Sequence, residues 1–271
     1  MLTDLTRVIT SNRPRFAYNV TSVEGFGALL DWGETHQKAM VLQCSERYLK
    51  DLGEDFFRRL VVPRLDESPV PFVLHLDHAG SLEAVLKGLQ IGFSSVMFDG
   101  STKPLNENIA LSQQAAKLAR MAEVSFEAEV GHVGGAEDGD EEEAALFTRV
   151  EDAKAFAEAV PLDFLAVSVG NAHGRYRRPP KIQLDRIADL AAAVSVPLVL
   201  HGGTGIPLSD LVEATRRGMA KINLGTELKL AWVAGVQSAL AAGETELDRI
   251  RAGARQSVTR VIQSMEELLA P

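Results

Sequence analysis

Three histidines in this chain each follow an apolar run typical of a β-strand. His78 ends the run Pro71-Phe-Val-Leu-His-Leu-Asp, His201 follows Pro197-Leu-Val-Leu, and His173 comes shortly after Phe164-Leu-Ala-Val-Ser-Val. Three neutral imidazoles suit Zn²⁺ and leave coordination positions open for water or a substrate. The sequence therefore predicts a catalytic metal centre on these residues. The alternative is that each is an ordinary polar residue at the end of a strand.

Asp77 lies directly before His78 and is the first candidate for acid–base chemistry. A carboxylate beside a divalent cation stays ionised and can accept the proton of a substrate hydroxyl. Two other roles are open, a hydrogen bond to His78 or a cap on a helix near Ser81. Because neighbouring strand residues point to opposite faces, we expect His78 to turn inward through the loop that follows.

Two glycine-containing turns are candidates for binding a phosphate. Gly202-Gly-Thr-Gly205 follows His201, and Asn223-Leu-Gly-Thr226 follows the last apolar run. Glycines let backbone N–H groups approach an anion, and a following helix adds its positive end. Glycine is also common in turns for geometric reasons alone.

Other charged residues after the apolar runs have two interpretations each. Asp99 and Glu129 can form a second metal position beside His78 or make salt bridges at the rim. Glu137, in the acidic stretch of residues 134–143, can carry a proton or belong to a solvated loop. Arg175, Arg177 and Arg178 can meet an anionic substrate, face solvent or contact another subunit. His75, within an apolar run, is expected to pack or donate behind the metal.

Eight short apolar runs alternate with helical patterns along the chain. The runs are Phe16–Val20, Ala39–Cys44, Phe72–Leu76, Ser94–Phe98, Ser125–Glu129, Phe164–Val169, Pro197–Leu200 and Ala220–Leu224. Helical spacing is found around 82–89, 109–118, 183–194, 208–218 and 227–240, with Gly92 and Gly218 at expected helix ends. Eight strand–helix units predict an α/β protein, a single-domain (β/α)8 TIM barrel over residues 1–271. Polar residues at the C-terminal ends of its strands would meet at one mouth.

Composition limits the partners of the protein. The net charge of −9 argues against nucleic-acid and anionic-membrane surfaces. No run approaches the roughly 18 apolar residues of a transmembrane helix, and the N-terminus lacks the apolar core of a signal peptide. The single cysteine, Cys44, cannot form an internal disulfide. We therefore expect a cytoplasmic protein with a small-molecule substrate.

From about Phe16 to Leu240 the chain resembles the class II, metal-dependent ketose-bisphosphate aldolases, particularly the tagatose- and fructose-bisphosphate branch. The motifs that carry the resemblance are Leu74-His-Leu-Asp-His78, Val96-Met-Phe-Asp-Gly-Ser101, Glu127-Ala-Glu-Val-Gly131, Gly134-Gly-Ala-Glu-Asp-Gly139, Ala172-His-Gly174, Leu200-His-Gly-Gly-Thr-Gly205 and Lys221-Ile-Asn-Leu-Gly-Thr-Glu227. Together these motifs are highly specific, although no single one is.

The resemblance implies a zinc-dependent lyase, a homodimer or homotetramer, that cleaves a ketose phosphate to dihydroxyacetone phosphate and an aldehyde. It implies His78, His173 and His201 as zinc ligands, with Asp99 and Glu129 at a second or displaced site. Asp77 would move the proton of the C4 hydroxyl, and Glu137 the proton of the enediolate. The phosphate and enediolate pocket, with a monovalent cation (Na⁺ or K⁺) nearby, would comprise Gly174, Gly202, Thr204, Asn223 and Thr226. Asn19 and Ser45 would lie near the other end of the substrate.

Several positions depart from the family pattern. Gly170-Asn171 replaces the usual Gly-Thr, and the acidic pair of the loop is reduced to Glu137. The Asp-Pro-Arg segment that helps bind the distal phosphate has no counterpart in residues 243–249. Arg249, Arg251, Arg255 or the cluster at 175–178 are the candidates to replace it. A substrate without a second phosphate is therefore an alternative.

Two other functions compete with the aldolase. A zinc-dependent hydrolase on the same barrel would attack an ester or amide with metal-bound water, but the two phosphate-type turns disfavour it. A non-catalytic partner subunit would be expected to have lost part of the site, whereas Asp77 and the three histidines are intact.

Overall fold

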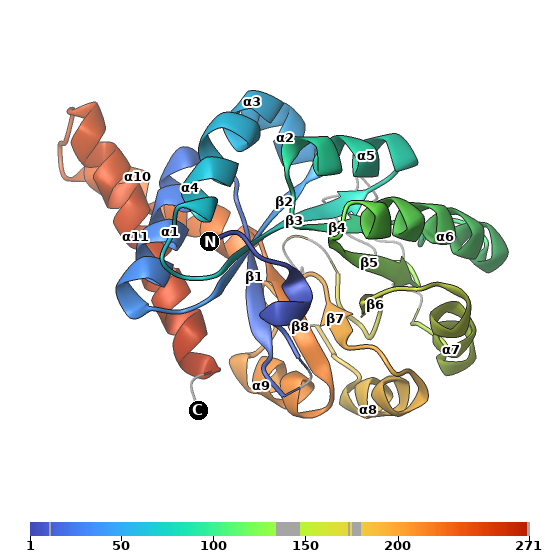
Figure 1. The fold of residues 1–271 in the computed structure, drawn as a ribbon. Coiled ribbons are helices and arrows are strands. Elements are labelled where there is room, and N and C mark those ends of the chain that lie inside the picture. Colours follow the sequence, from blue (N-terminus) through green and yellow to red (C-terminus); the bar gives the residue numbers. More distant parts are fainter. Residues whose placement is uncertain (11, 134–146, 173, 175–179, 270–271) are drawn as a thin grey trace.

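Eight parallel strands close into a barrel in the computed structural model, and β8 pairs with β1 (Figure 1). The strands are β1 (Arg15–Asn19), β2 (Met40–Ser45), β3 (Phe72–Ala79), β4 (Ser95–Phe98), β5 (Ser125–Val130), β6 (Phe164–Val167), β7 (Leu198–Leu200) and β8 (Met219–Leu224). The structure describes residues 1–10, 12–133, 147–172, 174 and 180–269. Each run predicted to be a strand overlaps one observed strand, so the (β/α)8 barrel is confirmed.

Helices surround the barrel and begin and end where local chemistry dictates. They are α1 (Val23–His36), α2 (Glu46–Leu52), α3 (Glu54–Phe56), α4 (Val62–Asp66), α5 (Leu82–Ile91), α6 (Leu105–Met121), α7 (Val150–Ala159), α8 (Leu184–Ala193), α9 (Leu208–Arg216), α10 (Thr226–Ala241) and α11 (Leu247–Leu268), with a 3₁₀ turn at Leu5–Arg7 and a π-helical turn at Phe57–Val61. Ser81 caps α5 by accepting a hydrogen bond from the Ala84 N–H. Gly92 ends α5 in the left-handed region at φ 108°. None of the helices in the described ranges is long and apolar enough to cross a membrane.

The barrel interior changes from apolar to charged along its axis. Strand β3 shows the change, because Val73, His75 and Asp77 alternate on one face and all three are buried. Around Val73 the interior is apolar, and the N-terminal segment closes this end with Leu5 and Ile9. Polar side chains from the strands surround His75 and Asp77 toward the C-terminal ends. The apolar half stabilises the barrel and the polar half is available for chemistry.

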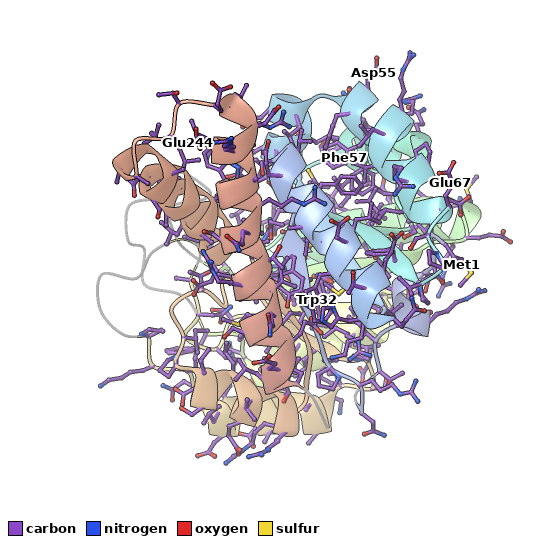
Figure 2. The ribbon with its side chains drawn as sticks, turned by 90° about the vertical axis from the view of Figure 1, so that its left-hand side faces the viewer. Met1, Trp32, Asp55, Phe57, Glu67 and Glu244 are labelled. Carbon is purple, nitrogen blue, oxygen red and sulfur yellow. The ribbon has the colours of Figure 1, made fainter. Side chains whose placement is uncertain are left out.

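The C-terminal helix α11, which the sequence patterns did not predict, lies alongside α1 and α10 (Figure 2). Arg251 pairs with Glu24 of α1 at 2.6 Å, and Arg255 pairs with Asp31. Arg249 pairs with Glu244 at 3.4 Å. Arg251 and Arg255 join α11 to α1 on the outside of the barrel, and Arg249 pairs with the linker before α11. A part for these arginines in binding a distal phosphate stays a prediction.

A buried phenol–carboxylate contact also joins α11 to the sheet. The Tyr18 hydroxyl donates to Glu266 Oε1 at 2.9 Å, and both residues are buried. Burial raises the pKa of the Glu266 carboxyl, although the Tyr18 hydrogen bond and the charges of Lys38 and Arg15 partly offset it. The folded protein therefore binds a proton here more tightly than the unfolded chain does.

The raised pKa of Glu266 yields a prediction for the Glu266→Gln variant. Because the pKa is raised on folding, ionised Glu266 reduces stability as pH rises through the folded-state value. Glutamine keeps an acceptor for Tyr18 without ionising, so Tm should rise at pH 7.5 and the gain should shrink toward pH 4. Thermal denaturation of both proteins across this range checks it. A lower Tm for the variant at pH 7.5 would contradict the assignment, and Glu267→Gln on the exposed face is the control.

Candidate active site

His78 reaches the barrel mouth through a bulge within β3. Between Leu76 and Ala79, three steps on β3 oppose two on β4, from Val96 to Phe98. His78 has a φ of 50°, the left-handed region that non-glycine residues rarely adopt. The bulge re-aims the side chain, so Asp77 and His78 serve one site although they are adjacent. We expected this turn in the following loop; the structure makes it inside the strand.

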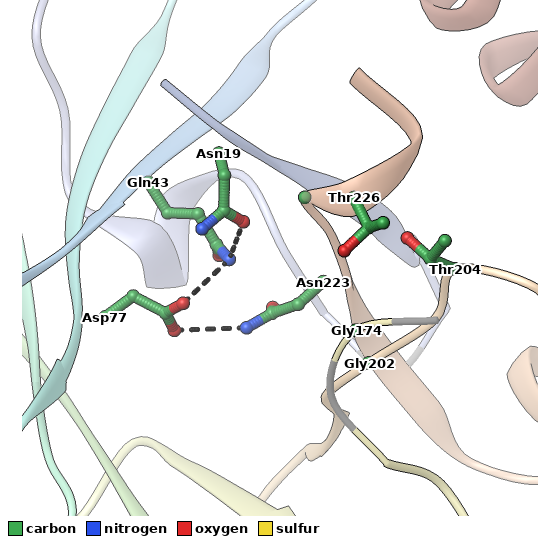
Figure 3. Close-up of a pocket in the computed structure, with 9 residues that line it drawn as sticks. Asn19, Gln43, Asp77, Gly174, Gly202, Thr204, Asn223 and Thr226 are labelled. Atoms are coloured by element: carbon green, nitrogen blue, oxygen red, sulfur yellow. Dashed lines mark hydrogen bonds between the residues drawn. The ribbon is translucent and has the colours of Figure 1, made fainter. Parts of the chain in front are cut away.

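Asp77 is held by two amides from neighbouring parts of the barrel. Gln43 Nε2 donates to Oδ2 at 3.0 Å, and Asn223 Nδ2 donates to Oδ1 at 3.1 Å (Figure 3). Gln43 Nε2 also donates to Asn19 Oδ1 at 2.7 Å. The cap of α5 is Ser81 itself, so Asp77 is not needed there. One donor to each oxygen fixes the plane of the carboxylate and favours its ionised form.

His78 and His201, the two histidines of the predicted triad that the structure describes, each hydrogen-bond to a carboxylate through one ring nitrogen. His78 Nδ1 lies 2.7 Å from Asp99 Oδ2, and His201 Nε2 lies 3.0 Å from Glu127 Oε1. The other nitrogen of His201, Nδ1, is 3.0 Å from Glu129 Oε2. The two imidazole rings meet edge to face, with centroids 4.5 Å apart. A carboxylate behind a histidine is the usual means of orienting a metal-ligating imidazole.

The balance of buried charge favours a cation at this place. Asp77, Glu127 and Glu129 are buried, and Lys221 is the one buried lysine or arginine in the described part of the chain. Burial opposes ionisation of Asp77, but His78 and His201 outweigh it and lower the pKa of the carboxyl. Burial and His78 lower the pKa of His201, but Glu127 and Glu129 raise it to about 9. These carboxylates stabilise a positive charge on His201.

The donor set fits a divalent metal ion. Asp77, His78 and His201 offer ligand atoms that lie within 4.8 Å of one another, and so do His78, Asp99 and Glu129. The two groups share His78. The first contains two of the three histidines predicted for the main site, together with Asp77, and the second contains the residues predicted for the second position. Imidazole with carboxylate is a donor set that zinc accepts.

A small polar pocket opens beside Asp77. Its lining includes seven residues predicted to lie in the site and two that were not, Gln43 and Gly225: Asn19, Gln43, Asp77, Gly174, Gly202, Thr204, Asn223, Gly225 and Thr226 (Figure 3). Helix α10 begins at Thr226, and the Thr204 hydroxyl accepts the Glu227 N–H at 3.3 Å. Gly202 has a φ of 63°, which glycine adopts without strain. Glycine turns at a helix N-terminus form an anion site.

Some predicted residues do not join this pocket. Ser45 ends β2 and precedes α2, and it does not line the pocket. His173, Glu137 and the arginines at 175, 177 and 178 lie outside the described residues. The predicted roles of all of them stay predictions.

Three buried polar residues escaped the sequence reasoning. Gln43, Glu127 and Lys221 lie on strands and look like ordinary strand positions when read singly. A signal was present, because each lies two residues from another polar residue: Ser45, Glu129 and Asn223. Polar residues at a period of two in an apolar run point into the polar half of a barrel.

Asn171, a departure from the family pattern, has a structural role. Its Oδ1 accepts the Val169 N–H at 2.7 Å, and its Nδ2 donates to the His201 carbonyl at 3.0 Å. The side chain thus joins the segment after β6 to the segment after β7. Gly170 before it has a φ of 98°, and a Cβ there would lie 2.5 Å from the Lys181 carbonyl oxygen.

Comparison with known proteins gives a consistent result. A sequence profile described as class-II fructose-bisphosphate aldolase matches residues 10–270. The chain is 40% identical over 220 residues to the fructose-bisphosphate aldolase of Streptococcus pyogenes, covering 79% of this chain and 74% of that protein. It is 39% identical to the 6-phospho-5-dehydro-2-deoxy-D-gluconate aldolase of Shouchella clausii, covering 85% and 80%.

A third relative and a solved structure extend the comparison. The sulfofructosephosphate aldolase of Alkalicoccus urumqiensis is 35% identical, over 83% of this chain and 78% of that protein. The crystal structure of the YdjI aldolase from Escherichia coli K12 superposes with a TM-score of 0.88 at 26% identity, covering 100% of this chain and 98% of that one.

We predict that Asn171→Ala lowers the free energy of unfolding of the metal-free protein by about 1–3 kcal/mol, because two buried backbone groups each lose a hydrogen bond. Urea denaturation measures it. The control is Asn106→Ala, at an exposed position of α6. A loss no larger than that of the control would mean that Asn171 does not hold these segments together.

Proposed function

The chain belongs to the class II fructose-bisphosphate aldolase family and is a lyase that cleaves a phosphorylated ketose by retro-aldol chemistry; on that premise we propose which residues carry the reaction. The observation that carries the proposal is the position of Asp77. Its carboxylate is held by Gln43 and Asn223, with a ligand atom within 4.8 Å of those of His78 and His201. A fixed, ionised base therefore lies beside a candidate cation site.

His78, His173 and His201 hold the catalytic zinc in this proposal, and Asp99 and Glu129 provide a second or displaced position with His78. The support is the pair of overlapping donor groups and the excess of buried carboxylates around them. When bound, the metal would polarise the ketone and stabilise the negative charge of the enediolate.

Asp77 acts as the base of the cleavage step. It accepts the proton of the C4 hydroxyl, the C3–C4 bond breaks, and C4 leaves as an aldehyde. The bonding electrons form the enediolate of dihydroxyacetone phosphate. Glu137, matched through the family motif, supplies the proton that C3 then takes up. Before the next turnover Asp77 releases its proton to solvent and Glu137 takes one up, which restores both carboxyl groups. The lowered pKa of Asp77 supports this role, because the carboxylate is ionised at neutral pH.

The pocket beside Asp77 binds the phosphate half of the substrate. Gly174, Gly202, Thr204 and Thr226, at the start of α10, supply backbone and hydroxyl donors, and a monovalent cation (Na⁺ or K⁺) binds nearby. Among the described residues, Asn223 Oδ1 and Gln43 Oε1 are buried without a hydrogen-bond partner. Two such acceptors suit the hydroxyls of a sugar.

The aldehyde half of the substrate lies toward Asn19 and Ser45. The relatives are named for substrates that differ in this half, a bisphosphate, a sulfo sugar and a gluconate. We therefore define the substrate as a ketose phosphate, such as fructose or tagatose 1,6-bisphosphate. The experiment below identifies the group carried by its aldehyde half.

The protein acts as a homodimer or homotetramer in the cytoplasm. Helix α10 supports the oligomeric state, because it packs on α11 yet leaves Leu230, Val233 and Leu240 exposed. An apolar stripe of this kind suits a second copy of the chain. The single cysteine, Cys44, is buried and can form no internal disulfide, which supports the cytoplasmic location.

The first experiment incubates the metal-loaded protein with dihydroxyacetone phosphate and a panel of aldehydes. The panel includes glyceraldehyde 3-phosphate and aldehydes with a carboxylate, a sulfonate or no charge. We expect a ketose 1-phosphate whose formation a chelator abolishes, and mass and stereochemistry identify the preferred partner. No product from any aldehyde, with metal bound, would overturn the proposed function.

The role of Asp77 is tested in the same assay with Asp77→Ala. Without the base, turnover should fall by about 10²–10⁴-fold while zinc content stays at the wild-type level. Asp189→Ala, an exposed carboxylate on α8, is the matched control. Wild-type turnover by Asp77→Ala would mean that another group takes the proton.

Light scattering tests the assembly. The expected mass is two or four times 29.3 kDa, and Val233→Asp should reduce it by placing a charge in the apolar stripe. A monomeric mass for the wild-type protein at micromolar concentration would refute the proposal.

A further inference from the structure

A buried ionic cluster lies beneath the pocket and joins His201 to Glu127 and Lys221, two residues to which the steps above give no role. Glu127 accepts a hydrogen bond from Lys221 Nζ on Oε2, at 2.8 Å, and one from His201 Nε2 on Oε1, at 3.0 Å. All three side chains are completely buried. Neither Glu127 nor Lys221 lines the pocket.

Stability alone gives little reason to place these charges inside the barrel. Removing a lysine and a glutamate from water costs free energy that their attraction often only matches, and apolar side chains of similar size can serve as well. The next layer of the same interior is apolar, with Val73, Met97 and Val199. The charged pair therefore occurs only where the strands approach the candidate metal centre, which indicates a role there.

The geometry indicates what that role is. Because Lys221 binds Oε2 of Glu127, the other oxygen faces His201 Nε2. A histidine that donates through Nε2 presents Nδ1 on the opposite side of its ring, here toward Glu129. His78 is held in the opposite sense, with Nδ1 on Asp99. Carboxylates thus hold different nitrogens of the two imidazoles, Nδ1 of His78 through Asp99 and Nε2 of His201 through Glu127.

His75 completes the cluster without adding charge. Its Nδ1 lies 2.7 Å from Ser95 Oγ, and its Nε2 lies 3.6 Å from Glu127 Oε2. Burial and the charge of Lys221 lower the pKa of His75 to about 3. The neutral ring packs beside the carboxylate, and Lys221 is then the one permanent cation in contact with Glu127 among the described residues.

We propose that Lys221 is a positioning residue for the metal centre: it fixes the Glu127 carboxylate against His201 Nε2 and thereby sets Nδ1 as the nitrogen that His201 presents to the metal ion. The inference rests on the proposed metal site at His78 and His201. It assigns a function to a lysine that touches neither the metal nor the substrate.

The test uses the metal-free protein of residues 1–271 and Co²⁺ as the probe. Lys221→Met alone removes the lysine from a buried carboxylate, and that variant is at risk of not folding. The deciding variant is therefore the double change Lys221→Met and Glu127→Gln, which removes both charges and keeps the side-chain volumes similar. Lys117→Met, on the exposed face of α6, is the matched control.

We expect the double variant to unfold in urea near the wild-type midpoint but to bind Co²⁺ about 10–100-fold more weakly in a chelator competition. Its visible cobalt absorption should also shift, because the imidazole is no longer held in one orientation. Wild-type affinity and spectrum in the folded double variant would overturn the positioning role. If instead wild-type protein binds Co²⁺ no better than His78→Ala or His201→Ala, the proposed metal site itself is wrong.

Discussion

The excess of buried negative charge at one end of a closed barrel governs the arrangement of the whole site. Asp77, Glu127 and Glu129 are removed from water, and Lys221 is the one buried lysine or arginine that the structure describes. Carboxylates in such a place require hydrogen bonds, cations or both. Asp77 receives hydrogen bonds from the amides of Gln43 and Asn223. Glu127 is bound by Lys221 and His201, and Glu129 lies against His201. A divalent metal ion would add the positive charge that the protein itself supplies only in part.

A bulge in the backbone of β3 brings two of these polar side chains to the same site. A regular β3 would point Asp77 into the barrel and His78 away from it. The extra residue between Leu76 and Ala79, with His78 in the left-handed region, brings both to the mouth. Strain of this kind persists only where surrounding structure enforces it. Here the enforcing contact is the hydrogen bond between His78 and Asp99, on the next strand-to-helix connection.

The strands could be predicted because each is an apolar run that ends in a polar residue. Asp77, His78 and His201 could be predicted for the same reason, since their places at strand ends identify them. Gln43, Glu127 and Lys221 lie within strands, where a polar residue is equally compatible with the outer face. Which face is buried in a polar layer depends on strand register and barrel closure, and neither is encoded locally.

The long-range contacts of α11 were unpredictable for a similar reason. The sequence around Arg251 and Arg255 carries positive charge but not the information that α1 supplies the partners. Asn171 differs again, because it departs from a familiar motif yet makes two buried hydrogen bonds. Departures in a motif therefore need a three-dimensional reading before they count against function.

The seam between the first and last strands has a consequence for folding. Asn19 on β1 lies against Gly225, where a Cβ would approach its side chain to 3.1 Å, and Asn223 on β8 reaches across to Asp77. Both contacts join residues far apart in sequence, 146 positions for Asn223 and Asp77, so they depend on the closure of the barrel by β8 and β1. Without β8 and the turn after it, the pocket would lack Asn223, Gly225 and Thr226. The pocket can therefore bind a ligand only after the eight-stranded barrel has closed.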